Sequence, residues 1–325
     1  MPELDANQGG DVNKKTYNKK ATGEALKTAE AHSAESDLKL YGSCFWYVLS
    51  ITLSISSPSI ISYIRATQKK SPSIPCISPK TNDQSPFVHR VWISLEHKKL
   101  PYEYVEVDVY RKPKLLLDIN PRGLVPALRH GEWGCYESTV LMEYLEDLSQ
   151  GPDLLPRDPK DRAHSRLWAD HINRNIVPNF YRYLQAQGEK DVVEHGKELQ
   201  TQIGKLVDAA HSPGPFFLGK DLGFVDVQIA PWVVRLKRVL GPYRGWPEPE
   251  EGSRWKKWVD AIEADPAVKA TTSDDQLYLD SYERYAGEFD VAIGFDIQTD
   301  TDDFTENRPN TSEVQRAISG GKGLP

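Results

Sequence analysis

The sequence predicts a two-domain protein in which an α/β unit is followed by an all-helical unit. Its 325 residues are enough for two domains of ordinary size. Short apolar strands alternate with amphipathic helices over residues 38–148. From residue 149 onward, after a linker rich in Pro and Asp at residues 152–159, apolar residues recur at helical spacing. These three observations together predict the fold class.

The first unit has the predicted order β-α-β-α-β-β-α. Its first helix is amphipathic, because Phe87, Val91 and Leu95 recur at i, i+4 spacing, and Pro86 occupies the favoured first turn. The predicted elements are a strand at 37–42, a helix at 86–98, a strand at 102–107, a helix at 112–118, strands at 125–129 and 134–136 around a turn at 130–132, and a helix at 138–148.

The second unit is predicted to contain five helices, at residues 161–187, 192–211, 224–240, 253–264 and 274–285. The third of them is the most apolar, so we expect it at the centre of the unit. Asp226 lies three residues after Gly223, where an acidic side chain can reach back and cap the start of that helix.

Composition and charge exclude several classes of partner. The formal net charge is −7 and the pI is about 5.7, and no block of basic residues occurs, so nucleic acid is not an expected partner. Three cysteines are too few for a disulfide framework, which indicates a reducing, cytoplasmic setting. His, Cys and carboxylate residues do not cluster at ligand spacing, so we expect no metal. Residues 1–37 are polar, lack a secretory signal and are predicted to be disordered.

Two segments interrupt the predicted order of strands and helices, at residues 46–84 and 287–305. The first is rich in Ser, Ile and Pro without helical or strand period, and the second is acidic and rich in Thr. Real surface loops are one interpretation, although loops this long are uncommon in compact domains. The uncharged residues 45–64 are long enough to span a membrane, but their serines and Pro58 disfavour that interpretation. A third interpretation is that both segments are translated introns.

We favour the intron hypothesis because the codons at each end permit splice signals. Trp46-Tyr47-Val48 can be encoded as TGGTATGTN, which contains a donor, and an AGY codon for Ser85 supplies an acceptor AG. Removal of residues 46–84 then leaves a cysteine codon in place of Ser85. Residues 287–305 permit the same excision, which would join the last helix to the tail at residues 306–325.

The most informative motif is the run Asn-Pro-Arg-Gly-Leu-Val-Pro at residues 120–126, followed by Tyr-Glu-Ser-Thr at residues 136–139. A cis bond before Pro126 costs only about 0.5–1 kcal/mol and would turn the Val125 N–H and C=O outward to pair with an extended peptide. Ser138 would begin a helix, where free N–H groups and the dipole bind a carboxylate. Glu137 beside it can bind an ammonium group.

Together with residues 86–92, 162–170 and 278–282, these motifs resemble a cytosolic glutathione transferase, most closely the fungal omega-like members. The resemblance covers nearly all of residues 38–45 and 85–286 and the final tail. It implies a thioredoxin-like domain followed by an all-α domain in a homodimer, with glutathione as co-substrate and a small electrophile or mixed disulfide as second substrate. It also implies that Glu137 and Ser138 hold the γ-glutamyl group. The glutathione contacts that it implies are Phe87, Lys112, Leu124, Val125, Pro126, Glu137 and Ser138.

The sequence departs from this family at the catalytic position. Ser85 stands where omega-like enzymes carry the cysteine of a Cys-Pro-Phe motif. A thiol at a helix start is acidified and exchanges with mixed disulfides, whereas a serine hydroxyl can only donate a hydrogen bond to the glutathione thiolate and favour conjugation. The printed sequence therefore predicts conjugation through Ser85, and the spliced sequence predicts thiol transfer or reductive deglutathionylation. Two alternatives stay open: Ser85 as a plain helix cap, and a regulatory glutathione-binding protein without chemistry.

Two aromatic residues of the helical unit are candidates for the second-substrate site. Trp168 and Tyr181 lie on the helix predicted at residues 161–187 and can line an electrophile pocket that faces the first domain. Large aromatic residues at helical spacing are equally often part of a core, so packing is the alternative for both.

Overall fold

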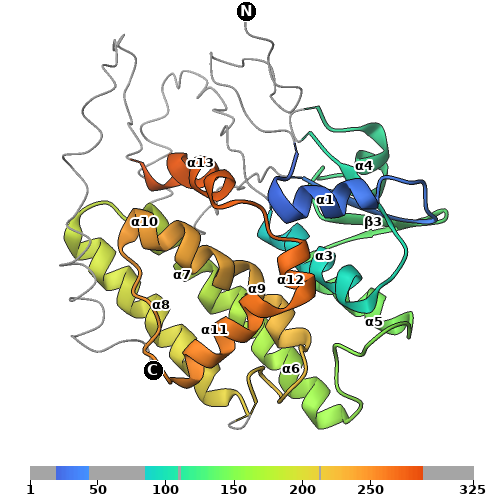
Figure 1. Cartoon of the computed structure of the whole chain (residues 1–325). Coiled ribbons are helices and arrows are strands. Elements are labelled where there is room, and N and C mark those ends of the chain that lie inside the picture. The colour runs from blue at the N-terminus through green and yellow to red at the C-terminus, as the bar shows by residue number, and fades with distance from the viewer. Residues whose placement is uncertain (1–19, 44–84, 109–110, 212–213, 288–325) are drawn as a thin grey trace, which may run out of the picture.

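The computed structural model describes residues 20–43, 85–108, 111–211 and 214–287 (Figure 1). An α/β unit and a helical unit pack against each other, with α3 and α9 in contact across the boundary. The elements of the first unit are α1 (Gly23–Ala31), β1 (Leu38–Gly42), α3 (Pro86–Lys98), β2 (Glu103–Glu106), α4 (Lys114–Ile119), β3 (Ala127–His130), β4 (Trp133–Tyr136) and α5 (Ser138–Asp147).

The sheet of the first unit has the strand order β2-β1-β3-β4. Strand β1 pairs parallel with β2 and antiparallel with β3, and β3 pairs antiparallel with β4. Apolar residues of α3 and α5 pack with Leu40 and Leu128 in one cluster, whereas Leu116 of α4 packs with Tyr41 and Ala127 in another. Because successive strand residues point to opposite faces, the two clusters cover the two faces of the sheet. The predicted thioredoxin-like arrangement is confirmed.

The second unit is helical, as predicted, but its long helices are interrupted. The helix predicted at residues 161–187 is divided by a π-helical turn, and the one predicted at residues 224–240 ends in another. The elements are α6 (Pro159–His171), η1 (Ile172–Ile176), α7 (Val177–Gln185), α8 (Glu189–Ala209), α9 (Phe224–Arg235), η2 (Leu236–Leu240), α10 (Gly241–Arg244), α11 (Arg254–Ala264), α12 (Pro266–Ala270) and α13 (Asp275–Ala286).

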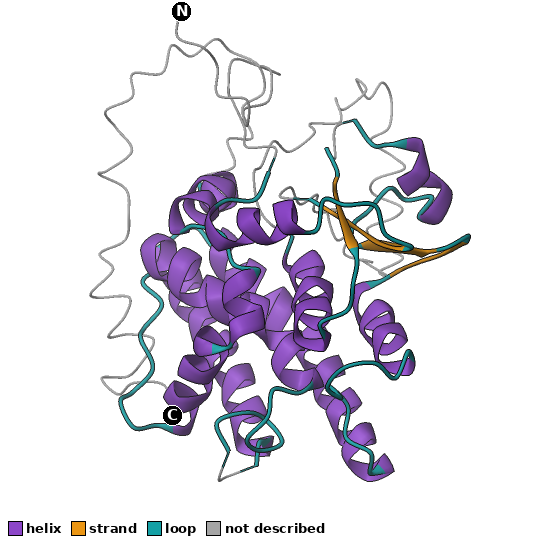
Figure 2. Cartoon of the chain, turned by 45° about the vertical axis from the view of Figure 1, so that its right-hand side comes forward, coloured by secondary structure: helices purple, strands orange, loops and turns teal. Residues whose placement is uncertain are grey.

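Helix α9 forms the centre of the second unit, as its apolar sequence predicts. Every residue from Phe224 to Arg235 is buried, and α3, α6, α11 and η2 contact this helix. Figure 2 shows that most of the helices gather on one side of the small sheet. Asp226 caps its start, as predicted, by accepting a hydrogen bond from the Gly223 N–H at 2.8 Å. This helix carries residues that face the α/β unit, so it positions one side of the candidate site.

The prediction of disorder for residues 1–37 is wrong for residues 20–37, which form α1 and the approach to β1. Ala21 and Ala25 are buried, and the Ala25 N–H and Thr28 hydroxyl donate hydrogen bonds to the carbonyl oxygens of Thr272 and Ala270. These partners lie some 240 residues further along the chain, so composition alone gave no sign of them. Residues 1–19 lie outside the described residues.

The two interrupting segments also lie outside the described residues, at 44–84 and 288–325, apart from Gly287 at the end of α13. The membrane interpretation of residues 45–64 falls in the same place. Within the described ranges, none of the helices has the length and apolar character needed to cross a membrane.

Candidate functional site

The turn before β3 presents an open backbone edge. The Val125-Pro126 peptide bond is cis, and Pro126 is buried at the start of the strand. The N–H and C=O groups of Val125 make no hydrogen bond with any described residue. An extended peptide can therefore pair with this residue as an added strand.

Asn120 stabilises the same turn through two hydrogen bonds. Its side-chain amide donates to the Leu124 carbonyl at 2.9 Å, and its Oδ1 accepts from the Arg122 N–H at 3.1 Å. Gly123 has a φ of 61°, and a Cβ there would lie 2.6 Å from Cδ of Lys112. The Lys112 side chain therefore lies against Gly123 in this turn.

Glu137 and Ser138 stand next to this turn at the start of α5. Glu137 has a φ of 78°, a left-handed conformation that is uncommon outside glycine and that often marks functional positions. Its exposed side chain pairs with Arg122. Ser138 is the first residue of the helix and is buried. The two residues bring a carboxylate and a helix N-terminus together beside the open edge of Val125.

Ser85 lies at the start of α3 and acts as its N-cap. Its Oγ accepts a hydrogen bond from the Val88 N–H at 3.5 Å, and the side chain is fully buried. Its own N–H donates to the carbonyl oxygen of Ser43 at 3.3 Å, which joins the end of β1 to the start of α3. The structure therefore assigns Ser85 the capping role that sequence analysis left as an alternative, at the position where a catalytic residue was predicted.

Arg90 lies one turn further along α3 and is buried between the two units. Its Nε donates to the Gln228 carbonyl at 2.9 Å and its Nη1 to Asn173 Oδ1 at 2.8 Å. Nη1 also lies 3.5 Å from Ser138 Oγ, and the guanidinium stacks 4.4 Å from the Trp232 ring. Burial lowers the pKa of Arg90 to about 9. This arginine connects the start of α5 to α9 and η1.

Phe87 and the two aromatic candidates have different surroundings. Phe87 packs edge-on against Trp232, with 5.4 Å between ring centres, so it faces α9. Trp168 donates to His164 Nε2 at 2.9 Å and contacts Phe217, all within the helical unit. Tyr181 packs edge-on against Phe180, with 5.2 Å between ring centres, and both residues lie on α7 of the helical unit.

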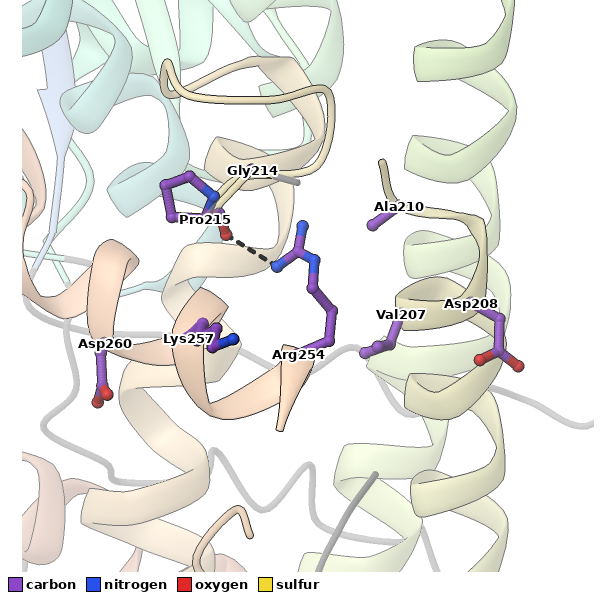
Figure 3. Close-up of a pocket in the computed structure, with 8 residues that line it drawn as sticks. All are labelled: Val207, Asp208, Ala210, Gly214, Pro215, Arg254, Lys257 and Asp260. Carbon is purple, nitrogen blue, oxygen red and sulfur yellow. Dashed lines mark hydrogen bonds between the residues drawn. The ribbon is translucent and has the colours of Figure 1, made fainter. Parts of the chain in front are cut away.

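A cavity of about 830 Å³ lies elsewhere, between the C-terminal end of α8, residues 214–215 and the start of α11 (Figure 3). The Arg254 guanidinium reaches into it and donates to the carbonyl oxygens of Pro215 at 3.0 Å and Phe216 at 2.7 Å. None of the site residues predicted from sequence lines this cavity. Among the described residues, no three His, Cys, Asp or Glu side chains converge as metal ligands would.

Two family models match the chain, the glutathione S-transferase N-terminal domain at residues 82–153 and its C-terminal domain at residues 175–261. Glutathione S-transferase U17 of Arabidopsis thaliana is 33% identical over 193 residues, which are 57% of this chain and 85% of that protein. The chain belongs to the glutathione S-transferase family.

Solved glutathione transferases agree with this assignment. Glutathione transferase Omega 3C from Trametes versicolor matches with a TM-score of 0.65 and 38% identity, over 82% of this chain and 97% of that one. A rice glutathione transferase, solved in complex with glutathione, matches with a TM-score of 0.57 and 26% identity, over 75% and 96% of the two chains. The relatives include omega and tau enzymes by name, so the family is shown and the subclass is a separate question.

Four residues of this candidate site were missed by sequence reasoning, namely Arg90, Asn120, Asn173 and Gln228. Asn120 shapes the turn, while Asn173 and Gln228 hold Arg90 from the helical unit. The Asn-Pro-Arg-Gly run gave a local signal for Asn120. Asn173 and Gln228 gave none, because their partner lies 83 and 138 residues away in the chain.

Proposed function

We propose that this transferase binds glutathione along Val125, with the γ-glutamyl ammonium at Glu137 and the carboxylate at Ser138. The observation that supports this most is the open Val125 backbone beside the left-handed Glu137 and the start of α5. Phe87, Lys112, Leu124 and Pro126 are proposed as further glutathione contacts. Isothermal titration with glutathione tests the proposal, and it predicts saturable binding that Val125→Pro abolishes.

For the chain as printed, the proposed reaction is conjugation. The glutathione thiolate attacks an electrophilic carbon, a carbon–sulfur bond forms and the leaving group departs with its electron pair. Ser85 would hydrogen-bond to the thiolate and lower its pKa. Turnover of a chloro-nitroaromatic substrate, reduced by Ser85→Ala and measured by absorbance, is the expected result.

A second candidate function has a specific observation in its favour. Ser85 is fully buried and its oxygen already accepts the Val88 N–H. This supports a glutathione-binding or regulatory protein without chemistry. Retention on immobilised glutathione, with no turnover of electrophiles or mixed disulfides, would be the outcome that favours this candidate over conjugation.

The third candidate is omega-like thiol transfer by a chain that lacks residues 46–84 and carries cysteine at position 85. The Ser85 N–H to Ser43 C=O hydrogen bond of 3.3 Å supports it. In the spliced chain these residues would be the first and fourth of four consecutive residues, and such a bond closes a β-turn. The cysteine thiolate would attack the glutathionyl sulfur of a mixed disulfide and release the substrate thiol. A second glutathione would then regenerate the thiol and leave as glutathione disulfide.

The test of this candidate is a variant that deletes residues 46–84 and replaces Ser85 by Cys. We expect it to fold and to reduce a glutathionylated thiol, while the same deletion with Ser85 retained folds and does not. Sequencing of the mature transcript between the codons for Phe45 and Pro86 determines separately whether cells make the chain without residues 46–84. An unfolded deletion variant would exclude the β-turn closure.

We further propose a cytoplasmic homodimer with an electrophile pocket between the two units. Trp168 and Tyr181 are the residues proposed to line this pocket. Several large apolar side chains are exposed and offer a dimer surface, namely Leu115, Leu117, Trp133, Val140 and Leu167. Sedimentation of the intact protein and of Trp133→Glu tests the dimer, which the substitution is expected to weaken.

A further inference from the structure

Helix α1 is bonded to both units of the protein. It lies beside α12 of the helical unit (Figure 1), where the Thr28 hydroxyl donates to the Ala270 carbonyl oxygen at 2.6 Å. At its C-terminal end, the carbonyl oxygen of His32 accepts from the Tyr104 N–H of β2 at 2.8 Å. The position of α1 therefore affects the segment that leads from α12 into α13 as well as the edge of the sheet.

The ring of His32 lies between two oxygen atoms. Its Nδ1 is 3.1 Å from the Tyr102 carbonyl oxygen, and its Nε2 is 3.2 Å from Oε1 of Glu96. The ring also stacks on the Tyr102 ring, with 3.9 Å between the ring centres. A carbonyl and an ionised carboxylate can only accept hydrogen bonds, and a neutral imidazole has a single N–H to donate. Only the doubly protonated imidazolium can donate to both oxygens, so this geometry fits a charged His32.

Glu96 is held as an ionised acceptor by its other neighbours. It accepts from the Tyr102 hydroxyl at 2.6 Å, and that hydroxyl accepts from Nε1 of Trp92 at 2.6 Å. Burial alone would raise the pKa of Glu96, but the hydrogen bonds from His32 and Tyr102 hold it below its ordinary value. In return, the hydrogen bond to Glu96 raises the pKa of His32 above the ordinary 6.5, although burial opposes it.

The other charged side chains around α1 are engaged elsewhere and keep their charge near neutral pH, as lysines and carboxylates ordinarily do. They are Lys39 of β1 with Glu103 of β2 and Glu35, and Lys27 of α1 with Glu24 and, through its field, Asp274.

Two further histidines, on α3, lie near the ends of α12. His89 Nε2 is 3.1 Å from the Thr271 hydroxyl, and His97 lies in the field of Asp265. Burial lowers the pKa of both rings, so both are neutral above pH 6.5. Among the described residues around α1, His32 is therefore the group that changes its charge as the pH rises through neutrality.

We propose that His32 is a pH-sensitive switch for the docking of α1, which is held while the imidazolium bonds to Glu96 and the Tyr102 carbonyl and is loosened when the proton is lost. The neutral ring would turn a lone pair toward one of the two oxygens and lose that hydrogen bond. Because the folded pKa lies above 6.5, the stabilisation is complete below pH 6.5 and is lost as the pH rises through the folded pKa. Each unit by which a pKa is raised corresponds to about a tenfold change in such an equilibrium.

The test is hydrogen–deuterium exchange of the full-length protein at about pH 6 and about pH 8.5, expressed as protection factors that correct for the intrinsic effect of pH. We expect the protection of residues 23–32 and 270–274 to fall by at least about threefold at the higher pH. Helix α8, which packs on α7 and η1, is the internal control and should keep its protection.

Substitutions separate the charge of His32 from its ring. His32→Lys stays positively charged at both pH values, so α1 should stay protected at both. His32→Gln has no charge to lose, so protection of α1 should be low and equal at both. Glu96→Gln should move the fall in protection to lower pH, because the group that raises the pKa of His32 is gone. His195→Gln on α8 is the matched control and should behave as the unaltered protein does.

The switch is refuted if α1 of the unaltered protein is equally protected at both pH values, or if α8 loses protection together with α1. It is also refuted if His32→Lys loses protection at the higher pH as the unaltered protein does. If His32→Lys does not dock at either pH, the shift expected for Glu96→Gln decides the question alone. The inference is independent of the proposed function, since a protein that fails to bind glutathione leaves every one of these outcomes unchanged.

Discussion

Lys98 Nζ lies 2.7 Å from Glu146 Oε2, and both side chains are almost completely buried. Glu146 also accepts hydrogen bonds of 3.0 Å from the N–H groups of Leu154 and Leu155, while Lys98 donates to the Pro152 carbonyl at 3.0 Å. The pair therefore joins α3 and α5 to the linker that leads into the helical unit. This attachment fixes where the second unit begins relative to the first.

Replacement of Glu146 by Gln should destabilise the protein strongly. Loss of one partner leaves a buried cation without compensation, for which about 3–5 kcal/mol is typical. Urea unfolding followed by tryptophan fluorescence measures the change. Glu143→Gln is the matched control, because Glu143 lies on the same helix and pairs with Arg166 at the surface. We expect a loss below about 1 kcal/mol there, and equal losses would contradict this account.

Stability should decrease with rising pH because of Asp226. Burial raises the pKa of Asp226 to about 7, although the Phe217 and Gly223 N–H groups and the Trp258 indole donate hydrogen bonds to its carboxylate. Since the folded pKa exceeds the ordinary value of 3.8, the folded protein keeps a proton that the unfolded chain loses. The free energy of unfolding should therefore fall between about pH 4 and pH 7, by up to about 4 kcal/mol.

Asp226→Asn isolates this contribution from other titrating groups. The variant cannot ionise at this position, so its free energy of unfolding should lack that part of the slope. Chemical unfolding at several pH values, compared between the two proteins, gives the difference. If the free energy of unfolding depends on pH in the same way in both proteins, Asp226 does not titrate in this range.

Helix α1 should contribute measurably to stability, although its sequence suggests disorder. Ala25 is completely buried against residues near the end of the helical unit, so Ala25→Glu would place a charge and extra volume there. We expect a loss of about 2–4 kcal/mol. Glu30→Gln on the exposed side of the same helix is the control and should be neutral. Thermal unfolding measures the stability of both variants. If Ala25→Glu is as stable as the unaltered protein, α1 does not pack against the rest of the protein in solution.

Glu137 should determine binding of the ligand ammonium. Its carboxylate is exposed and pairs with Arg122 in the free protein, so glutathione must compete with that arginine. Glu137→Gln is expected to weaken glutathione binding about tenfold, whereas glutaryl-cysteinylglycine, which lacks the ammonium, should be affected little. Titration calorimetry gives both constants. Glu132→Gln on the neighbouring hairpin is the control and should leave both constants unchanged.

The turn at residues 120–126 could be predicted because its signals are local. Asn120, Gly123, Val125 and Pro126 lie within seven residues, and backbone geometry over that distance follows from residue type. The strand and helix order of the first unit was equally predictable, because each element shows its own period. The helix bounds were less certain, since the π-helical turns at η1 and η2 change the hydrogen-bond register without changing the apolar pattern.

The sequence by itself determined the two-domain fold class and the turn at residues 120–126, since both depend on short-range patterns. Only the tertiary structure decided that Arg90 is a buried cation, that Lys98 and Glu146 hold the linker and that residues 20–37 are folded. A charged residue on an amphipathic helix is ordinarily exposed, and the sequence alone favours that expectation. The physical reason is that burial of Arg90 depends on Asn173 and Gln228, which are neighbours in space but not in sequence.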